Sequence, residues 1–292
     1  MRVLKELLKN PLSLTGVLLV LFFAVIAVAA PLIAPPADPD DPYQIPRDGF
    51  LAEPSPPNAE HPFGTSEGQY DIFYGVVWGT RTAFRVGLIV TGIALVIGVS
   101  VGTLAGYYGG VVDELLMRVV EIFMAFPFLL AAITLAAVLM PRIGRGLIVG
   151  MIALTIFGWM GYARLIRSDI LSVKEREYVQ AAQAVGASDL RIIFRHVLPN
   201  AIFPTLVMGS MDIGTYVLTF SFLSFLGLGA PRGYADWGQL ISFARNWIPV
   251  LSQYWYIMVY PGIAILLFVL GWNLLGDAFR DILDPRMRGA RG

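Results

Sequence analysis

Residues 177–200 read EYVQAAQAVGASDLRIIFRHVLPN, a polar and helix-prone segment between two long apolar stretches. Because the flanking stretches are apolar enough to cross a membrane, the polar segment between them is predicted to lie in water as a loop. No phosphate-binding motif of the form G-x-x-x-x-G-K-[ST] occurs in the chain. A membrane protein without an energy site of its own receives energy from a partner, so we expect this loop to be a cytoplasmic docking segment.

The composition is that of an integral membrane protein. Of the 292 residues, 57% are hydrophobic and 14% are charged, and the mean hydropathy is +0.69, which is far more apolar than a soluble domain of this length. The formal net charge of zero argues against a nucleic-acid partner. The chain has no Cys, which excludes disulfides and thiolate chemistry. Its two His residues, His61 and His196, are expected on opposite sides of the membrane, so no metal or catalytic site is predicted.

Six stretches are long and apolar enough to cross the hydrocarbon core of a bilayer, which takes about 20 residues. They are residues 12–33, 82–106, 119–140, 147–165, 201–228 and 254–275. The fold class expected from them is an all-α membrane protein with six transmembrane helices.

The distribution of Lys and Arg predicts that both termini are cytoplasmic. With the N-terminus inside, the inner segments hold Arg2, Lys5, Lys9, Arg118, Arg164, Arg167, Lys174, Arg176, Arg191, Arg195, Arg280, Arg286, Arg288 and Arg291. The outer segments hold Arg47, Arg81, Arg85, Arg142, Arg145, Arg232 and Arg245. This excess on the inside follows the rule that cytoplasmic loops are enriched in positive charge.

The N-terminal part divides into residues 1–33, a transmembrane anchor, and residues 34–79, an extracytoplasmic loop. The alternative for the first segment is a cleavable secretory signal, but its apolar run is longer than the about 7–15 residues of a signal. The loop is rich in Pro and in acidic residues, which predicts an irregular linker with turns. It either is simply solvated or contacts an outside partner.

Small residues and prolines predict how some of the helices pack. Gly98, Gly102, Gly106 and Gly110 recur every four residues and therefore share one helix face, where they allow a second helix to approach closely. Packing within the chain is favoured over a dimer interface. Pro127 in the third stretch and Pro261 in the sixth each predict a kink.

Asp212 is the ionisable residue that lies near the middle of a predicted span, in VMGSMDIGTYV. Charged groups at this depth are costly and therefore usually functional. Ser210 and Thr215 lie on a similar helical face, so the three residues are candidates for the wall of a translocation pathway. An Asp that hydrogen-bonds another helix for structural reasons is an equally good interpretation.

Two short helices joined at a glycine are predicted within the central loop. Ala181 and Ala182 lie among strong helix formers, and Gly186 permits a turn with positive φ. Ser188 is a candidate N-cap for a second helix running through Arg195, which Pro199 is expected to end. An amphipathic loop helix lying on lipid headgroups has the same pattern.

The segment QAAQAVGASDLRIIFRHVLPN resembles the EAA motif of permease subunits of ATP-binding-cassette importers, with Ala181, Ala182, Gly186, Leu198 and Pro199 on the family's pattern. Similarity to OppC/DppC-like peptide and nickel permeases extends over almost the whole chain. It is carried by HPFGT at 61–65, AGYYGGVVDELLMRVVEIFMAFP at 105–127, GYARLIRSDILSVKEREYV at 161–179, SFLGLG at 224–229 and LLGDAFRDILDPRMR at 274–288.

The resemblance implies a type I importer permease fold, with a permease domain at 80–280, an ATPase coupling loop at 174–199 and a cytoplasmic tail at 281–292. The coupling residues it implies are Gln180, Ala181, Ala182, Gly186, Ala187, Ser188, Leu198 and Pro199. The implied partners are a homologous OppB/DppB-like permease, two cytoplasmic ATPases that bind ATP and Mg²⁺, and an extracytoplasmic binding protein. The implied location is the cytoplasmic membrane of a bacterium or archaeon. The expected cargo is a di- or oligopeptide, with nickel, glutathione or an oligosaccharide as alternatives.

Two features depart from the family pattern. Gln180 stands where the motif usually has Glu, so an ion pair to the ATPase is not expected there. After HPFGT the chain reads SEGQYD in place of the family's Asp followed by Gly-Arg-Asp.

Other function classes fit the sequence less well. GTSEG at 64–68 matches G-x-S-x-G, but a nucleophile elbow requires a strand, a turn and a helix, and this Pro-rich loop predicts none of them. A stand-alone secondary transporter would show inverted repeats and intramembrane charge relays. A structural scaffold would have no use for the glycine hinge at Gly186.

Overall fold

The computed structural model describes residues 10–283, so the sequence-based expectations for residues 1–9 and for the tail after Leu283 lie outside the described part. Across the described residues the secondary structure is helical, and β-structure is limited to three isolated bridges in the outer loops. The main helices are α2 (Pro11–Ile33), α3 (Ile72–Tyr108), α4 (Gly110–Met124), α5 (Phe128–Ile143), α6 (Leu147–Gly158), α7 (Met160–Val173), α11 (Phe203–Phe225) and α14 (Tyr256–Leu283). The shorter ones are α8 (Glu177–Ala184), α9 (Asp189–Ile192), the π-helical η1 (Ile193–Val197), α10 (Leu198–Ala201), α12 (Trp237–Phe243), the 3-10 helix η2 (Ala244–Val250) and α13 (Leu251–Tyr254).

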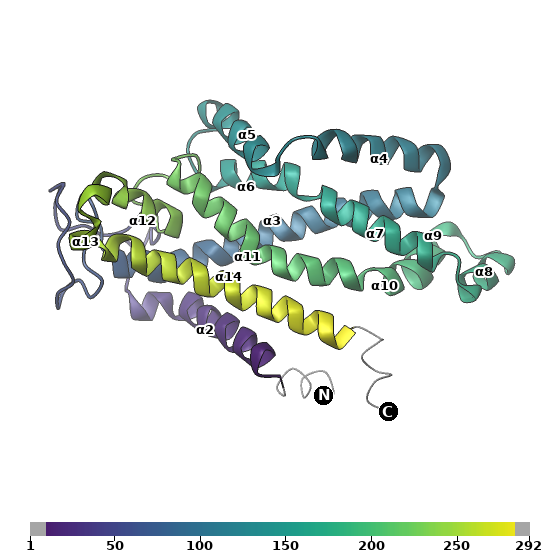
Figure 1. Cartoon of the computed structure of the whole chain (residues 1–292), viewed down its shortest axis with the longest axis horizontal. Helices are drawn as coiled ribbons and strands as arrows, with labels where there is room; N and C mark the ends of the chain where they lie inside the picture. The colour runs from purple at the N-terminus through teal and green to yellow at the C-terminus, as the bar shows by residue number, and fades with distance from the viewer. Residues whose placement is uncertain (1–9, 284–292) are drawn as a thin grey trace.

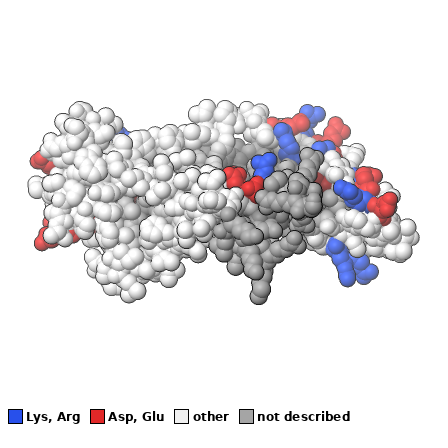
Figure 2. All heavy atoms as spheres, turned by 60° about the horizontal axis from the view of Figure 1, so that its bottom comes forward, with Lys and Arg blue, Asp and Glu red and all other residues white. Residues whose placement is uncertain are grey.

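The helices form an elongated bundle with a polar segment at each end (Figure 1). α8 and α9 project from one end, whereas α12, α13 and the loop before α3 gather at the other. α2 runs toward the α12–α13 end and α14 runs back from it, as expected for an even number of crossings. Charged side chains cluster around the α8 end, and the face shown in Figure 2 has a broad uncharged band beside them. This band is the lipid-facing belt of a membrane protein.

Five helical segments are long and apolar enough to span a membrane, and a sixth span exists if α4 and α5 are counted together. The sequence predicted the third span as one helix with a kink at Pro127. The structure instead bends by 81° between α4 and α5. Pro127 occupies the N-cap position of α5 and cannot donate a backbone hydrogen bond to α4. The expected kink is therefore a complete break.

α3 begins ten residues before the predicted apolar stretch, at Ile72 rather than at residue 82. Asp71 caps it by accepting a hydrogen bond from the Tyr74 N–H at 2.8 Å. The first turns are buried because Trp78 packs into the aromatic core and donates from Nε1 to the Ala34 carbonyl at 2.9 Å. Hydropathy alone missed these turns because their burial is against protein rather than lipid.

The glycine face of α3 packs against α7, as predicted for contact within the chain. A Cβ at Gly98 would lie 2.5 Å from the Trp159 carbonyl oxygen, and one at Gly102 would lie 2.2 Å from that of Ala163. A Cβ at Gly106 would lie 3.0 Å from the Arg167 carbonyl oxygen, a tight contact but a longer one than at Gly98 or Gly102. The prediction was wrong for Gly110, which belongs to α4, has a φ of +52° and has open space around it.

The contact between α4 and α7 is an ion pair. Arg167 donates from Nε and Nη2 to the two carboxylate oxygens of Asp113, both at 2.5 Å. A bidentate pair of this kind fixes both distance and orientation. It ties the first half of the broken span to the helix that leads into the central loop.

The loop before α3 is irregular, as predicted, but it is folded onto the bundle. Ile45 is buried in the main core, and the Ala235 N–H donates to the Tyr43 carbonyl at 2.7 Å. His61 lies between two carboxylates, with Nδ1 2.7 Å from Asp71 and Nε2 2.5 Å from Asp48. The loop is therefore anchored at both its start and its end.

Candidate functional site

The central loop has the predicted helix, glycine, helix shape, and its turn is a Schellman motif at the end of α8. Gly186 has a φ of +77°. Its N–H donates to the Gln183 carbonyl at 2.9 Å, and the Ala187 N–H donates to the Ala182 carbonyl at 3.1 Å. A Cβ on Gly186 would meet no atom within 4 Å. Glycine is therefore required here by backbone conformation rather than by lack of space.

The residues predicted to contact a partner differ in exposure. Gln180, Ala181 and Ser188 are exposed, whereas Ala182 and Ala187 are half-buried against the rest of the loop. The Gln180 side chain donates from Nε2 to the Glu175 carbonyl at 3.3 Å. Ser188 occupies the N-cap position of α9, as predicted, but its hydroxyl makes no capping hydrogen bond.

Three large apolar side chains on this loop are mostly exposed, and sequence reasoning did not identify them. Val185 is 83% exposed, Leu190 66% and Phe194 67%. Val185 is the C-cap residue of α8, Leu190 lies in α9 and Phe194 lies in η1. Charged side chains gather at this end of the molecule (Figure 2). Apolar groups exposed within a polar segment make this loop a candidate interaction surface. Their signal in the sequence was an apolar residue immediately beside the glycine turn or two to six residues after the N-cap.

The loop rests firmly on the bundle despite its exposed apolar surface. Val179, Ile192 and Val197 are buried together with Ile166 and Ile170 of α7. At the far side of the loop, the Tyr107 hydroxyl at the end of α3 donates to Asp189 Oδ1 at 2.8 Å. The loop is thus held at its first helix, its second helix and its exit.

The prediction that Pro199 ends the second helix was wrong. The chain stays helical from Asp189 through the π-helical turn η1 and through α10, which leads into α11 after Ile202. Pro199 lies in the first turn of α10, where its missing N–H is not needed. Leu198 is half-buried and Pro199 is exposed. The loop and α11 are therefore joined by nearly continuous helix.

The candidate pathway residues all lie on α11, but they do not share one face, because Ser210 is directed toward Gly276 of α14 and Asp212 toward Tyr162 of α7. Asp212 is half-buried and its Oδ2 accepts a hydrogen bond from the Tyr162 hydroxyl of α7 at 2.6 Å. Ser210 Oγ donates to the Val207 carbonyl of its own helix at 2.7 Å, and Thr215 is exposed. The exposed face that includes Thr215 continues outward through the exposed Leu218 and Phe222. The hydrogen bond from Tyr162 matches the structural interpretation of Asp212, and the partial exposure matches the pathway interpretation.

The G-x-S-x-G segment has none of the geometry of a nucleophile elbow. Ser66 is completely buried, and its hydroxyl donates to the Glu67 carbonyl at 3.4 Å rather than pairing with His61. Both ring nitrogens of His61 are bonded to the carboxylates of Asp71 and Asp48.

Asp48, Glu60 and His61 present ligand atoms within 4.8 Å of one another on the outer surface. Burial acts to lower the pKa of His61, but hydrogen bonds and charge attraction from Asp71 and Asp48 outweigh it and raise that pKa above the ordinary value. A protonated imidazole can donate to both carboxylates, so ion pairs of His61 with Asp48 and Asp71 account for these contacts.

Comparisons with known proteins agree on one family. Residues 98–289 match the family described as "Binding-protein-dependent transport system inner membrane component", and residues 1–54 match the "N-terminal TM domain of oligopeptide transport permease C". The chain is 38% identical to the dipeptide transport system permease protein DppC of Alkalihalophilus pseudofirmus, over 97% of this chain and 89% of that protein. It is 35% identical to the oligopeptide transport system permease protein OppC of Bacillus subtilis, over 96% and 87%.

Two further comparisons concern substrate range and fold. The chain is 37% identical to the glutathione transport system permease protein GsiD of Pectobacterium atrosepticum, over 80% of this chain and 75% of that protein. Its fold is similar to a chain of the MetNI methionine ABC transporter in an inward-facing conformation, with a TM-score of 0.59 at 20% identity, over 73% of this chain and 98% of that one.

Proposed function

Because the chain belongs to the family of binding-protein-dependent transport system inner membrane components, we propose that it carries di- or oligopeptides across the cytoplasmic membrane as one of two permease subunits. The peptide assignment is supported by relatives named for dipeptide and oligopeptide transport at 35–38% identity. ATP is hydrolysed by separate cytoplasmic subunits, and an external binding protein delivers the substrate.

The observation that carries this proposal is the helical connection between the exposed loop surface and α11. Val185, Leu190 and Phe194 provide an apolar surface for an ATPase cleft, with the small side chains of Ala181 and Ala182 beside it. Movement of the docked loop is transmitted through η1 and α10 to α11. Since α11 bears Asp212, ATP-dependent closure of the ATPases alters the pathway face. Coupling of this kind requires that ATP binding favours one of the two conformational states of the permease over the other.

The pathway itself is formed between this chain and a second, homologous permease. Support comes from the exposed side of α11 at Thr215, next to the half-buried Asp212, which no other helix of the described chain fully covers. A polar side chain there would otherwise face lipid at an energetic cost. A second permease packed across this face would enclose a polar route.

Docking is tested by purifying the chain, expressed with its partner subunits, and measuring recovery of the ATPases. Leu190→Glu places a charge in the proposed contact and should greatly reduce ATPase recovery. Phe50→Glu is the matched control, because Phe50 is 80% exposed on the outer loop and should leave recovery unchanged. Equal recovery from both variants would contradict docking through this surface, and uptake that needs no ATP would exclude the importer assignment.

Glutathione is a second candidate substrate because the chain is 37% identical to a glutathione permease. Calorimetric titration of the cognate binding protein with dialanine, longer alanine peptides and glutathione separates the two. Tight binding of glutathione alone would replace the peptide assignment.

A further inference from the structure

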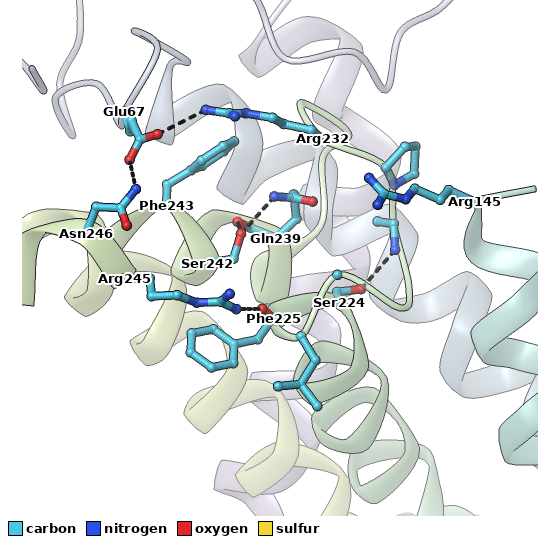
Figure 3. Close-up of a pocket in the computed structure, with 14 residues that line it drawn as sticks. Glu67, Arg145, Ser224, Phe225, Arg232, Gln239, Ser242, Phe243, Arg245 and Asn246 are labelled. Atoms are coloured by element: carbon cyan, nitrogen blue, oxygen red, sulfur yellow. Dashed lines mark hydrogen bonds and ion pairs between the residues drawn. The ribbon is translucent and has the colours of Figure 1, made fainter. Parts of the chain in front are cut away.

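A pocket at the outer end of the bundle has more positive charge than its own residues neutralise. It lies where α11 ends, between α12, η2 and the loop that joins α5 to α6, and its volume is about 250 Å³ (Figure 3). Arg145, Arg232 and Arg245 all line it. They come from three separate segments, so the fold itself gathers these charges on an outer surface that is otherwise rich in Asp and Glu.

Glu67 is the sole carboxylate in the pocket lining, and both of its oxygens are already engaged. Arg232 donates to Oε1 at 3.1 Å and Asn246 donates to Oε2 at 2.7 Å (Figure 3). Arg245 donates to the Phe225 carbonyl at the end of α11. Arg145 makes no ion pair or side-chain hydrogen bond with the residues that the structure describes, and in Figure 3 its guanidinium points toward the pocket.

The lining therefore has three guanidinium groups and one carboxylate, which is already paired with Arg232. A planar guanidinium pairs best with a carboxylate or phosphate, through two parallel hydrogen bonds. The rings of Phe225 and Phe243 supply apolar surface beside the charges. A ligand that fits has an anionic group next to an apolar or aromatic side chain.

The position and size of the pocket restrict this ligand further. It adjoins the outer end of α11, the helix that bears Asp212. Phe225 lies thirteen positions after Asp212, a rise of about 20 Å along the helix. The volume is below the about 300–1,000 Å³ of pockets that enclose a whole drug-sized ligand. The pocket therefore accommodates one end of a peptide rather than its full length.

We propose that this pocket binds the C-terminal carboxylate of the incoming peptide, with Arg145 as its principal ligand. The inference rests on the proposed function as a peptide permease. The inference adds a binding site at the outer side, about 20 Å from Asp212 along the helix. A peptide released by the binding protein is held there by its carboxylate before the peptide moves inward. Arg232 and Arg245 keep their present partners and contribute to the positive field.

The test uses the complete importer in lipid nanodiscs without the binding protein, and dialanine and dialanine amide as probes. Saturation-transfer difference NMR measures their binding. Dialanine should bind the wild-type complex roughly ten-fold more tightly than the amide, and Arg145→Gln should weaken dialanine binding roughly ten-fold, or about 1.4 kcal/mol. Arg142→Gln is the matched control, because Arg142 lies three residues away and does not line the pocket.

Equal binding of dialanine and its amide, or equal dialanine binding by the wild-type and Arg145→Gln complexes, would overturn the inference. So would an Arg145→Gln complex that binds dialanine normally but loses stimulation of its ATPase by the binding protein, since the pocket would then receive an acidic side chain of that protein. ATP-driven uptake by the wild-type complex is measured in parallel. A complex that hydrolyses ATP but transports no peptide refutes the proposed function, whereas one that transports peptide without these binding differences refutes only the carboxylate site.

Discussion

Replacing Gly102 with Ala should destabilise the packing of α3 on α7. The new Cβ would lie 2.2 Å from the Ala163 carbonyl oxygen and 2.5 Å from Ile166 Cγ2, both well inside the 3.4 Å at which ordinary contact begins. The obstructing atom belongs to the backbone and cannot rotate away, so the two helices must separate. Overpacking of a well-packed core costs about 1–3 kcal/mol, and we expect the upper half of this range.

Thermal unfolding of the purified protein in detergent, followed by tryptophan fluorescence, measures this effect. Gly92→Ala is the matched control, since Gly92 lies in the same helix and a Cβ there meets nothing within 4 Å. The free energy of unfolding of the control should lie within about 0.5 kcal/mol of the wild-type value or slightly above it, because Ala favours the helix. If Gly102→Ala and Gly92→Ala unfold at the same temperature, α3 and α7 do not pack as closely as described.

Three other predictions concern coupling, the pathway and pH. Gly186→Val should preserve membrane insertion but lower uptake per ATP hydrolysed in proteoliposomes, because a β-branched residue adopts the positive-φ conformation at a cost of at least about 1–2 kcal/mol. Gly186→Asn is the control and should retain most coupling. Normal coupling in the Val variant would show that the turn is dispensable. Asp212→Asn should change the relative uptake of acidic and basic peptides if the residue faces the pathway, and an unchanged ratio would assign it to the Tyr162 hydrogen bond alone. The raised pKa of His61 means that its stabilising effect is complete below an unfolded-state pKa of about 6.5 and is lost as the pH rises through the folded-state value. Protease resistance of the outer loop should therefore fall as the pH rises through the raised pKa of His61, and His61→Gln should remove this pH dependence. A wild-type loop that is equally resistant at acidic and at alkaline pH would contradict the ion pairs of His61.

The apolar stretches and the glycine turn could be predicted from sequence because each depends on local chemistry. Hydropathy over about 20 residues reports directly on the cost of placing a helix in lipid. Gly186 could be recognised because a helix end commonly requires a residue with positive φ. The packing of Gly98 and Gly102 followed from spacing alone, although the partner helix α7 did not.

The features that sequence reasoning missed depend on tertiary contacts. Nothing local distinguishes Ile72–Arg81 of α3 from a loop, because these turns are stabilised by the aromatic core and the folded outer loop. Pro127 signalled a disturbance but not an 81° bend, which depends on what α4 and α5 pack against. The exposure of Val185 and Phe194 depends on how the loop packs on α7, because Val179 and Ile192 of the same loop are also apolar but are buried.

The outer arginine pocket was equally invisible in the sequence. Arg145, Arg232 and Arg245 are separated by up to a hundred residues, and the positive-inside count treated them only as outside charges. Their convergence depends on α12 and η2 folding back beside the end of α11 (Figure 3).

The π-helical turn Ile193–Val197 makes the segment between the loop and α11 sensitive to insertion or deletion of a residue. Each residue of an α-helix rotates the chain by 100° about its axis, and a π turn accommodates an additional residue without breaking the helix. The turn therefore sets the direction in which Leu190 points around the helix axis relative to the face of α11 that carries Asp212. The loss or gain of a single residue between them would turn one surface away from its partner.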